Sequence, residues 1–129
     1  MCLEVSVVIS ASVKRGIGAE RLQEVSGLHV KKHGNRLHFS RTGGCSCDLM
    51  AKGIAQKGSS WLLADDAAAK LADTVAFIGK EAKSFSFQIV WLGETLEAPV
   101  RMKLNTLVTS VRNNTVPKNT PIIVGSFDF

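Results

Sequence analysis

The pair Gly34-Asn35 constrains the fold of this chain more than any other feature of its sequence. Two strand-like runs within residues 28–41 flank the pair, which suits the positive φ angles of a tight hairpin turn. Side chains on one face of a strand recur at every second residue, so the turn position decides which residues share a face. One face collects all three histidines of the chain and is predicted to be polar and cationic. Its members are His29, Lys31, His33, Arg36, His38 and Ser40.

The opposite face of this hairpin is apolar. Val30, Leu37 and Phe39 share it, and they are predicted to enter the core. The same turn sets the pairing, with His33 facing Arg36 and Lys31 facing His38. The position of one turn therefore predicts a complete register.

Periodicity predicts several further elements. Alternating apolar residues indicate strands over residues 3–12 and 84–92, and a short strand is expected over residues 122–124. Helical spacing indicates one helix over residues 65–82, which begins with two aspartates, and another that starts at Leu104 and ends near Asn113-Asn114.

Three other segments are less regular. A short helix is predicted over residues 48–55, and Gly93-Glu94 is predicted to turn the chain into a strand that continues through Val100. Residues 19–25 fit either a helical turn or a ragged strand, and the structure of residues 13–27 and 93–103 stays open. By length, residues 1–129 form a single α+β domain. We expect an antiparallel or mixed β-sheet with helices packed on one face, a two-layer sandwich.

Charge is unevenly distributed along the chain. The net charge is +5, and residues 1–60 carry nine Lys or Arg against four Asp or Glu, whereas the remaining residues are balanced. A local basic field attracts anions such as phosphate, nucleic acid or acidic proteins. Exposed aromatic residues that would stack on bases are not evident, because the chain has no Tyr and its Phe residues follow core positions. Nucleic-acid binding is therefore suggested by charge alone.

The N-terminal residues read as a strand and not as an export signal, and the apolar stretches are too short to span a membrane. The chain contains three cysteines, Cys2, Cys45 and Cys47, which cannot all pair with one another. A cytoplasmic protein with reduced thiols is the expectation. The chain also lacks a phosphate-binding loop and a dinucleotide-binding glycine signature, so no cofactor is expected.

The segment from Gly43 to Asp48 is the most unusual one, because it places Cys45 and Cys47 two residues apart after two glycines. Three interpretations stay open: structural cysteines, a reactive or redox pair, and a metal site completed by Cys2, Asp48 or a histidine. His38 lies on the strand that leads into this loop and is a candidate proton acceptor, while Arg41 is a candidate source of positive charge.

Three classes of function follow from these features. The favoured one is a non-catalytic binding module for an anionic ligand or a protein partner, using His29, Lys31, His33, Arg36, His38 and Arg41. The alternatives are a thiol-dependent enzyme or redox protein that uses Cys45, Cys47 and His38, and a weak nucleic-acid-binding protein. A complete catalytic constellation is not evident, and a homodimer is a further hypothesis because open sheets in short chains often pair with a second copy.

Overall fold

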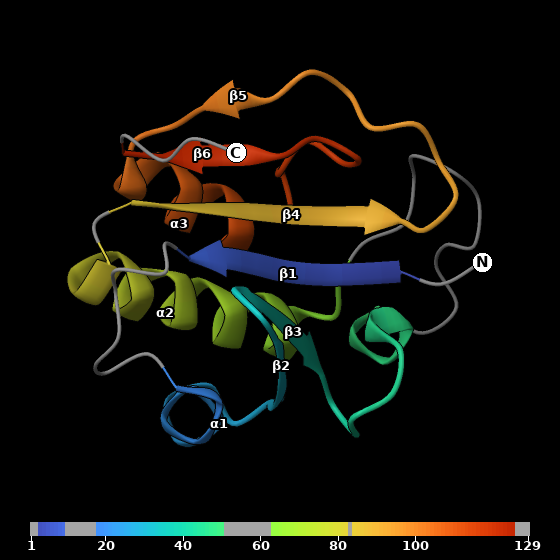
Figure 1. Ribbon diagram of the computed structural model, residues 1–129, viewed down its shortest axis with the longest axis vertical. Helices are drawn as coiled ribbons and strands as arrows, with labels where there is room; N and C mark the ends of the chain where they lie inside the picture. The colour runs from blue at the N-terminus through green and yellow to red at the C-terminus, as the bar shows by residue number, and fades with distance from the viewer. Residues whose placement is uncertain (1–2, 10–17, 51–62, 83, 126–129) are drawn as a thin grey trace.

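A computed structural model describes residues 3–9, 18–50, 63–82 and 84–125 of the chain. In these residues it shows a six-stranded mixed sheet with three α-helices and one short 3₁₀ turn, which confirms the predicted α+β fold (Figure 1). The elements in chain order are β1 (Leu3–Ile9), α1 (Ala19–Ser26), β2 (His29–His33), β3 (Arg36–Ser40), η1 (Ser46–Leu49), α2 (Asp65–Ala82), β4 (Phe85–Trp91), β5 (Val100–Arg101), α3 (Leu104–Arg112) and β6 (Ile122–Val124).

The strands are ordered β2-β3-β1-β4-β6-β5, and all neighbours are antiparallel except β5 and β6. In Figure 1, α2 and α3 pass behind the sheet, so one sheet face is covered by helices and the other is turned to the viewer. None of the helices in the described part of the chain is long and apolar enough to cross a membrane.

The centre of the sheet is the pair β1 and β4. They pair along their whole length, from Leu3 opposite Trp91 to Ile9 opposite Phe85. Alternate residues of both strands belong to one continuous apolar core with the helices, as the period-two pattern predicts. The strand predicted over residues 84–92 is thus confirmed, and so is the part of the first strand up to Ile9; residues 10–12 lie outside the described residues.

The hairpin forms at the predicted position and in the predicted register. His33 lies opposite Arg36, Lys31 opposite His38, and the apolar face is buried. Gly34 has a φ of 59°, whereas Asn35 is not among the residues with positive φ. Glycine therefore occupies the first central position of the turn, the position that a type II′ turn reserves for it.

The helices agree with their apolar spacing. The long helix α2 spans Asp65–Ala82, and α3 ends at Arg112, just before Asn113. The undecided segment at residues 19–25 is helical and forms α1, because Leu22 and Ser26, one turn apart, are both buried against the core. Gly27 follows with a φ of 70° and closes this helix with a left-handed cap.

Two predictions need correction. Residues 48–50 do not begin an α-helix: a 3₁₀ turn spans Ser46–Leu49, and Met50 is extended because it forms a β-bridge with Leu63. Residues 51–55 of that prediction lie outside the described residues. The strand expected after Gly93 is also much shorter, since only Val100 and Arg101 pair with β6.

Candidate functional site

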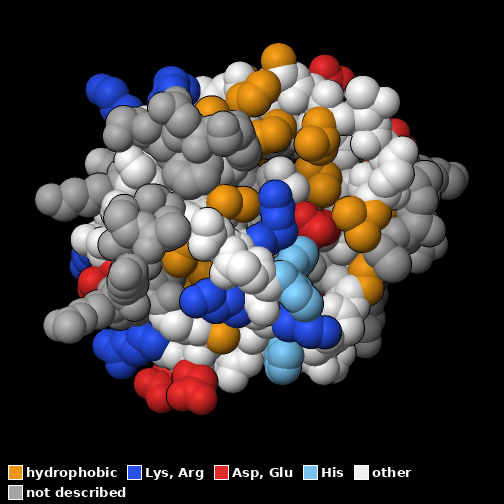
Figure 2. Space-filling model, viewed as in Figure 1, with side chains coloured by type: hydrophobic (Ala, Val, Ile, Leu, Met, Phe, Trp, Pro, Cys, Tyr) orange, Lys and Arg blue, Asp and Glu red, His pale blue; other side chains and the backbone are white. Residues whose placement is uncertain are grey.

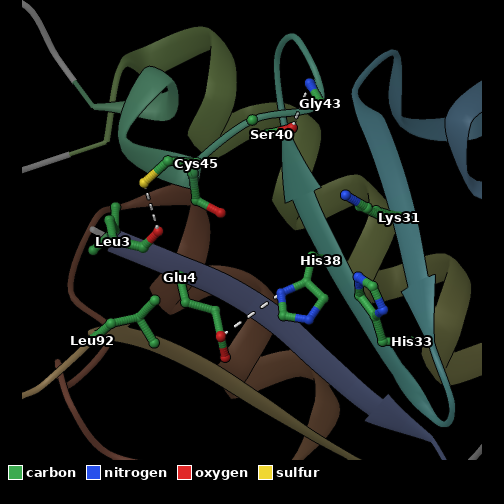
Figure 3. A pocket seen from close by; sticks show the side chains of 11 residues that line it. Leu3, Glu4, Lys31, His33, His38, Ser40, Gly43, Cys45 and Leu92 are labelled. Carbon is green, nitrogen blue, oxygen red and sulfur yellow. Dashed lines mark hydrogen bonds and ion pairs between the residues drawn. The ribbon is translucent and has the colours of Figure 1, made fainter. Parts of the chain in front are cut away.

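A hollow opens on the sheet face that the helices leave uncovered, where β1, the hairpin and the loop after β3 meet (Figure 3). Its volume is about 340 Å³, at the small end of the range for ligand clefts. The residues that line it are Leu3, Glu4, Lys31, His33, His38, Ser40, Gly43, Gly44, Cys45, Ser46 and Leu92. On this face, histidine side chains lie beside Lys and Arg side chains and close to apolar ones (Figure 2).

The hairpin supplies the cationic side of the hollow. Lys31 and His33 extend from β2, and His38 extends from β3 directly opposite Lys31. The rings of His33 and His38 meet edge to face, with centroids 5.4 Å apart. Lys31 forms no ion pair with any residue that the structure describes, so its ammonium group is available to a ligand.

The glycine loop is held against the hairpin by two contacts. The hydroxyl of Ser40 accepts a hydrogen bond of 2.9 Å from the Gly43 amide. The ring of His29 lies over Gly43, where a Cβ atom would stand only 3.2 Å from ring atoms, and Gly43 has a φ of 93°. His29 therefore shares the predicted face but positions the loop and does not line the hollow.

Glu4 forms the floor of the site and was not among the residues predicted to belong to it. Its Oε1 accepts hydrogen bonds from Ser6 Oγ at 3.0 Å, Gln88 Nε2 at 3.1 Å and Arg36 Nη1 at 3.4 Å. Its Oε2 lies 3.8 Å from Nδ1 of His38. Arg36, a predicted anion ligand, is therefore already paired with a carboxylate of the protein.

His38 lies between Glu4 and a group of positive charges. Partial burial lowers the pKa of His38 from its usual 6.5, and the neighbouring Arg36, His33 and Lys31 lower it further, while the carboxylate of Glu4 raises it. Desolvation and repulsion outweigh the one attraction, so the imidazole is mainly neutral at pH 7. A bound anion would oppose these effects and favour the protonated ring.

Arg41, the last predicted anion ligand, is not among the residues that line the hollow. Its guanidinium donates two hydrogen bonds of 2.8 Å to the carboxylate of Asp66, and its Nε donates to the Asp48 carbonyl at 2.8 Å. The bond to Asp66 raises the pKa of Arg41, and Arg41 in turn lowers the pKa of Asp66 to about 2. This pair fastens the loop to the start of α2.

The segment from Cys45 to Cys47 completes the edge of β1. Residues 6–8 of β1 pair with β3, but the strand extends beyond this pairing to Leu3. There the Leu3 amide donates to Cys47 Sγ at 3.1 Å, the Val5 amide donates to Ser46 Oγ at 3.1 Å, and Cys45 Sγ donates to the Leu3 carbonyl at 3.4 Å. Side chains thus satisfy backbone groups that a longer β3 would otherwise pair with.

The two sulfur atoms lie close together at the side of the hollow. Neither cysteine is in a disulfide, both are half-buried, and their Sγ atoms are 2.9 Å apart. Cys45 lines the hollow together with His38, but Nδ1 of His38 is directed at the carboxylate of Glu4. This ring nitrogen is therefore not placed to accept a proton from Cys45, the role predicted for His38.

The described residues around Cys45 and Cys47 do not support a metal site. Within the described ranges, no three His, Cys, Asp or Glu side chains meet in a way that could hold a metal ion. The Asp48 carboxylate, one of the suggested ligands, instead accepts hydrogen bonds from the amides of Arg41 and Thr42 and from the Thr42 hydroxyl. Cys2, another suggested ligand, lies outside the described residues.

Comparisons with protein-family models, with characterised proteins and with solved structures found no match for the chain.

Proposed function

We propose that this protein is a binding module whose hollow takes a small organic anion, such as a carboxylate or a phosphate ester. The observation that carries the proposal is the convergence of Lys31, His33 and His38 on one hollow. An ammonium group and two imidazoles are donors that recognise carboxylate and phosphate oxygens. Because the Lys31 ammonium has no acidic partner among the described residues, an anion can bind it without displacing a protein carboxylate, whereas His38 already faces the carboxylate of Glu4.

The rest of the lining narrows the class of ligand. Leu3 and Leu92 add apolar surface beside the cationic groups, and the Leu92 side chain is about half exposed. A ligand with a charged group and a short apolar part would contact both regions, whereas a bare inorganic ion would contact only one. The volume of about 340 Å³ restricts the ligand to a small molecule.

Two observations disfavour nucleic acid as the ligand. Arg36 is paired with Glu4 and Arg41 with Asp66, so two of the predicted phosphate ligands already bind acidic side chains. The hollow is also a compact site and not a groove that follows a backbone, and among the described residues no Phe, Tyr or Trp lines it. A cytoplasmic location, a protein partner and a homodimer stay predictions that rest on the sequence.

Lysines 31 and 32 provide a matched test. They are adjacent in β2 but point to opposite faces, since Lys31 pairs with His38 and Lys32 pairs with Leu37. We expect inorganic phosphate and citrate to shift the amide resonances of residues 31, 33, 38, 43 and 44 in NMR titrations. Lys31→Gln should weaken binding by about tenfold, because it removes a charge-assisted hydrogen bond. Lys32→Gln makes the same change in net charge and should alter the affinity by less than about twofold.

Acidification should strengthen the binding of an anion whose own charge is constant, such as sulfate. As the pH falls below 6.5, His38, whose pKa lies below that value, gains a proton, and a bound anion favours that protonation. Equal losses in the two lysine variants, or resonance shifts spread over the whole basic surface, would show a general electrostatic field and would contradict a specific site. Among anions of equal charge, butyrate is expected to bind more tightly than acetate, because Leu3 and Leu92 offer apolar surface as well.

A further inference from the structure

The adjacency of Cys45 and Cys47 is not explained by anion binding. Their Sγ atoms are 2.9 Å apart, and a disulfide bond is roughly 2.05 Å long, so less than about 1 Å separates this pair from a covalent bond. The fold holds both sulfurs at this place, since Leu3 contacts each of them through its amide and its carbonyl. A hydrogen bond of 3.4 Å from the Cys47 amide to Cys45 Sγ turns the two side chains toward each other.

We propose that Cys45 and Cys47 form a reversible dithiol–disulfide pair that exchanges with small-molecule disulfides. Cys45 lines the hollow and Cys47 does not, which assigns the first attack to Cys45. Cys47 packs against the hydrophobic core behind it and completes the reaction as the resolving thiol.

The exchange proceeds in two balanced steps. The Cys45 thiolate attacks one sulfur of the small disulfide, a mixed disulfide forms, and one thiolate leaves. The Cys47 thiolate then attacks Cys45 Sγ, the internal disulfide forms, and the second thiolate leaves. The protein loses two protons and two electrons, and the small disulfide is reduced to two thiols.

Oxidation would also change the end of β1. The internal disulfide removes the Cys45 thiol hydrogen, so the hydrogen bond from Cys45 to the Leu3 carbonyl is lost, while Cys47 Sγ can still accept from the Leu3 amide. The redox state of the pair is therefore connected to the strand that carries Glu4 into the hollow. The proposal does not depend on which anion the hollow binds.

The experiment equilibrates the wild-type protein with mixtures of reduced and oxidised glutathione, once folded and once in guanidinium. Free thiols are then alkylated, and the tryptic peptide 42–52, which contains Cys45 and Cys47 and no other cysteine, is analysed by mass spectrometry. The fraction of this peptide without label reports the fraction of the pair that is oxidised. Because the fold holds the sulfurs together, we expect the equilibrium constant for oxidation to be at least about tenfold larger in the folded protein. An equal or smaller constant in the folded protein would overturn the proposal.

Two variants sharpen the result. Cys47→Ser should stop at a mixed disulfide on Cys45, whereas Cys2→Ser should still form the internal disulfide. Pairing of either cysteine with Cys2, or a stable mixed disulfide in the wild type, would contradict the proposed pair. The neutral hydroxyethyl disulfide should oxidise the pair as well, which separates this reaction from anion binding. If it oxidises the pair while the phosphate titration shows no binding, only the proposed anion ligand is ruled out.

Discussion

The two faces of the sheet are built from alternate residues of the same strands, yet they are stabilised in different ways. On the helix-covered face, Val5, Val7, Phe85 and Phe87 are buried in one apolar cluster. On the open face, the intervening Ser6, Ser86 and Gln88 are buried too, although they are polar. Among the described residues, no buried side-chain nitrogen or oxygen lacks a hydrogen-bond partner.

This difference separates the residues that stabilise the fold from those proposed to bind a ligand. Apolar burial is non-directional, so the covered face needs only residues of suitable size and pattern. The polar residues of the open face depend on specific partners, because a buried polar group without one costs free energy. Val90 and Ile123 on the same face are buried and apolar. Glu4 joins these partners to the hollow through His38, one of the three groups proposed to bind a ligand.

Neighbouring residues of β4 give the largest expected contrast. Phe87→Ala removes a fully buried ring from the covered face and should lower the free energy of unfolding by about 4 kcal/mol. Gln88→Ala removes one hydrogen bond to Glu4 on the open face and should lower it by about 1 kcal/mol. Urea denaturation measures both values, and similar losses in the two variants would show that the faces do not differ as described.

Substitutions of Glu4 test how much the polar network contributes to the free energy of unfolding. Glu4→Ala removes the acceptor shared by Ser6, Gln88 and Arg36 and should lower the free energy of unfolding by about 2 kcal/mol. This value is discounted because the Arg36 side chain is 35% exposed and can be solvated in the variant. Glu4→Gln keeps an oxygen acceptor and should cost less. If both variants lost the same free energy in urea denaturation, the negative charge and not the hydrogen bonds would dominate.

The smallest effect is a pH dependence that comes from His38. Since the folded state lowers the pKa of His38 below its usual 6.5, the unfolded chain binds the proton more strongly. The stability contributed by the neutral ring is complete above pH 6.5 and is lost as the pH falls through the folded pKa. Glu4→Gln removes the one neighbour that raises this pKa, so an NMR titration should find the pKa of His38 lower still. An increase in that variant would contradict the assigned geometry.

The sequence by itself determined the local units of this protein. The turn at Gly34-Asn35 and the alternation around it were enough for the hairpin, its register and its polar face, because both depend on residues close together in the chain. The helix over residues 65–82 followed from apolar spacing for the same reason. The short 3₁₀ turn at residues 46–49 was missed because a bridge to Leu63 holds Met50 extended.

Only the tertiary structure decided what the hollow contains. Glu4 reaches His38 because β1 pairs with β3 in a register that places Ser6 opposite His38. Cys45 and Cys47 meet the end of β1 across more than 40 residues of chain, and Arg41 is neutralised by an aspartate of a distant helix. Long-range strand pairing and ion pairs leave no periodic pattern in the sequence, so the polar network, the paired arginines and the adjacent sulfurs could not be read from it.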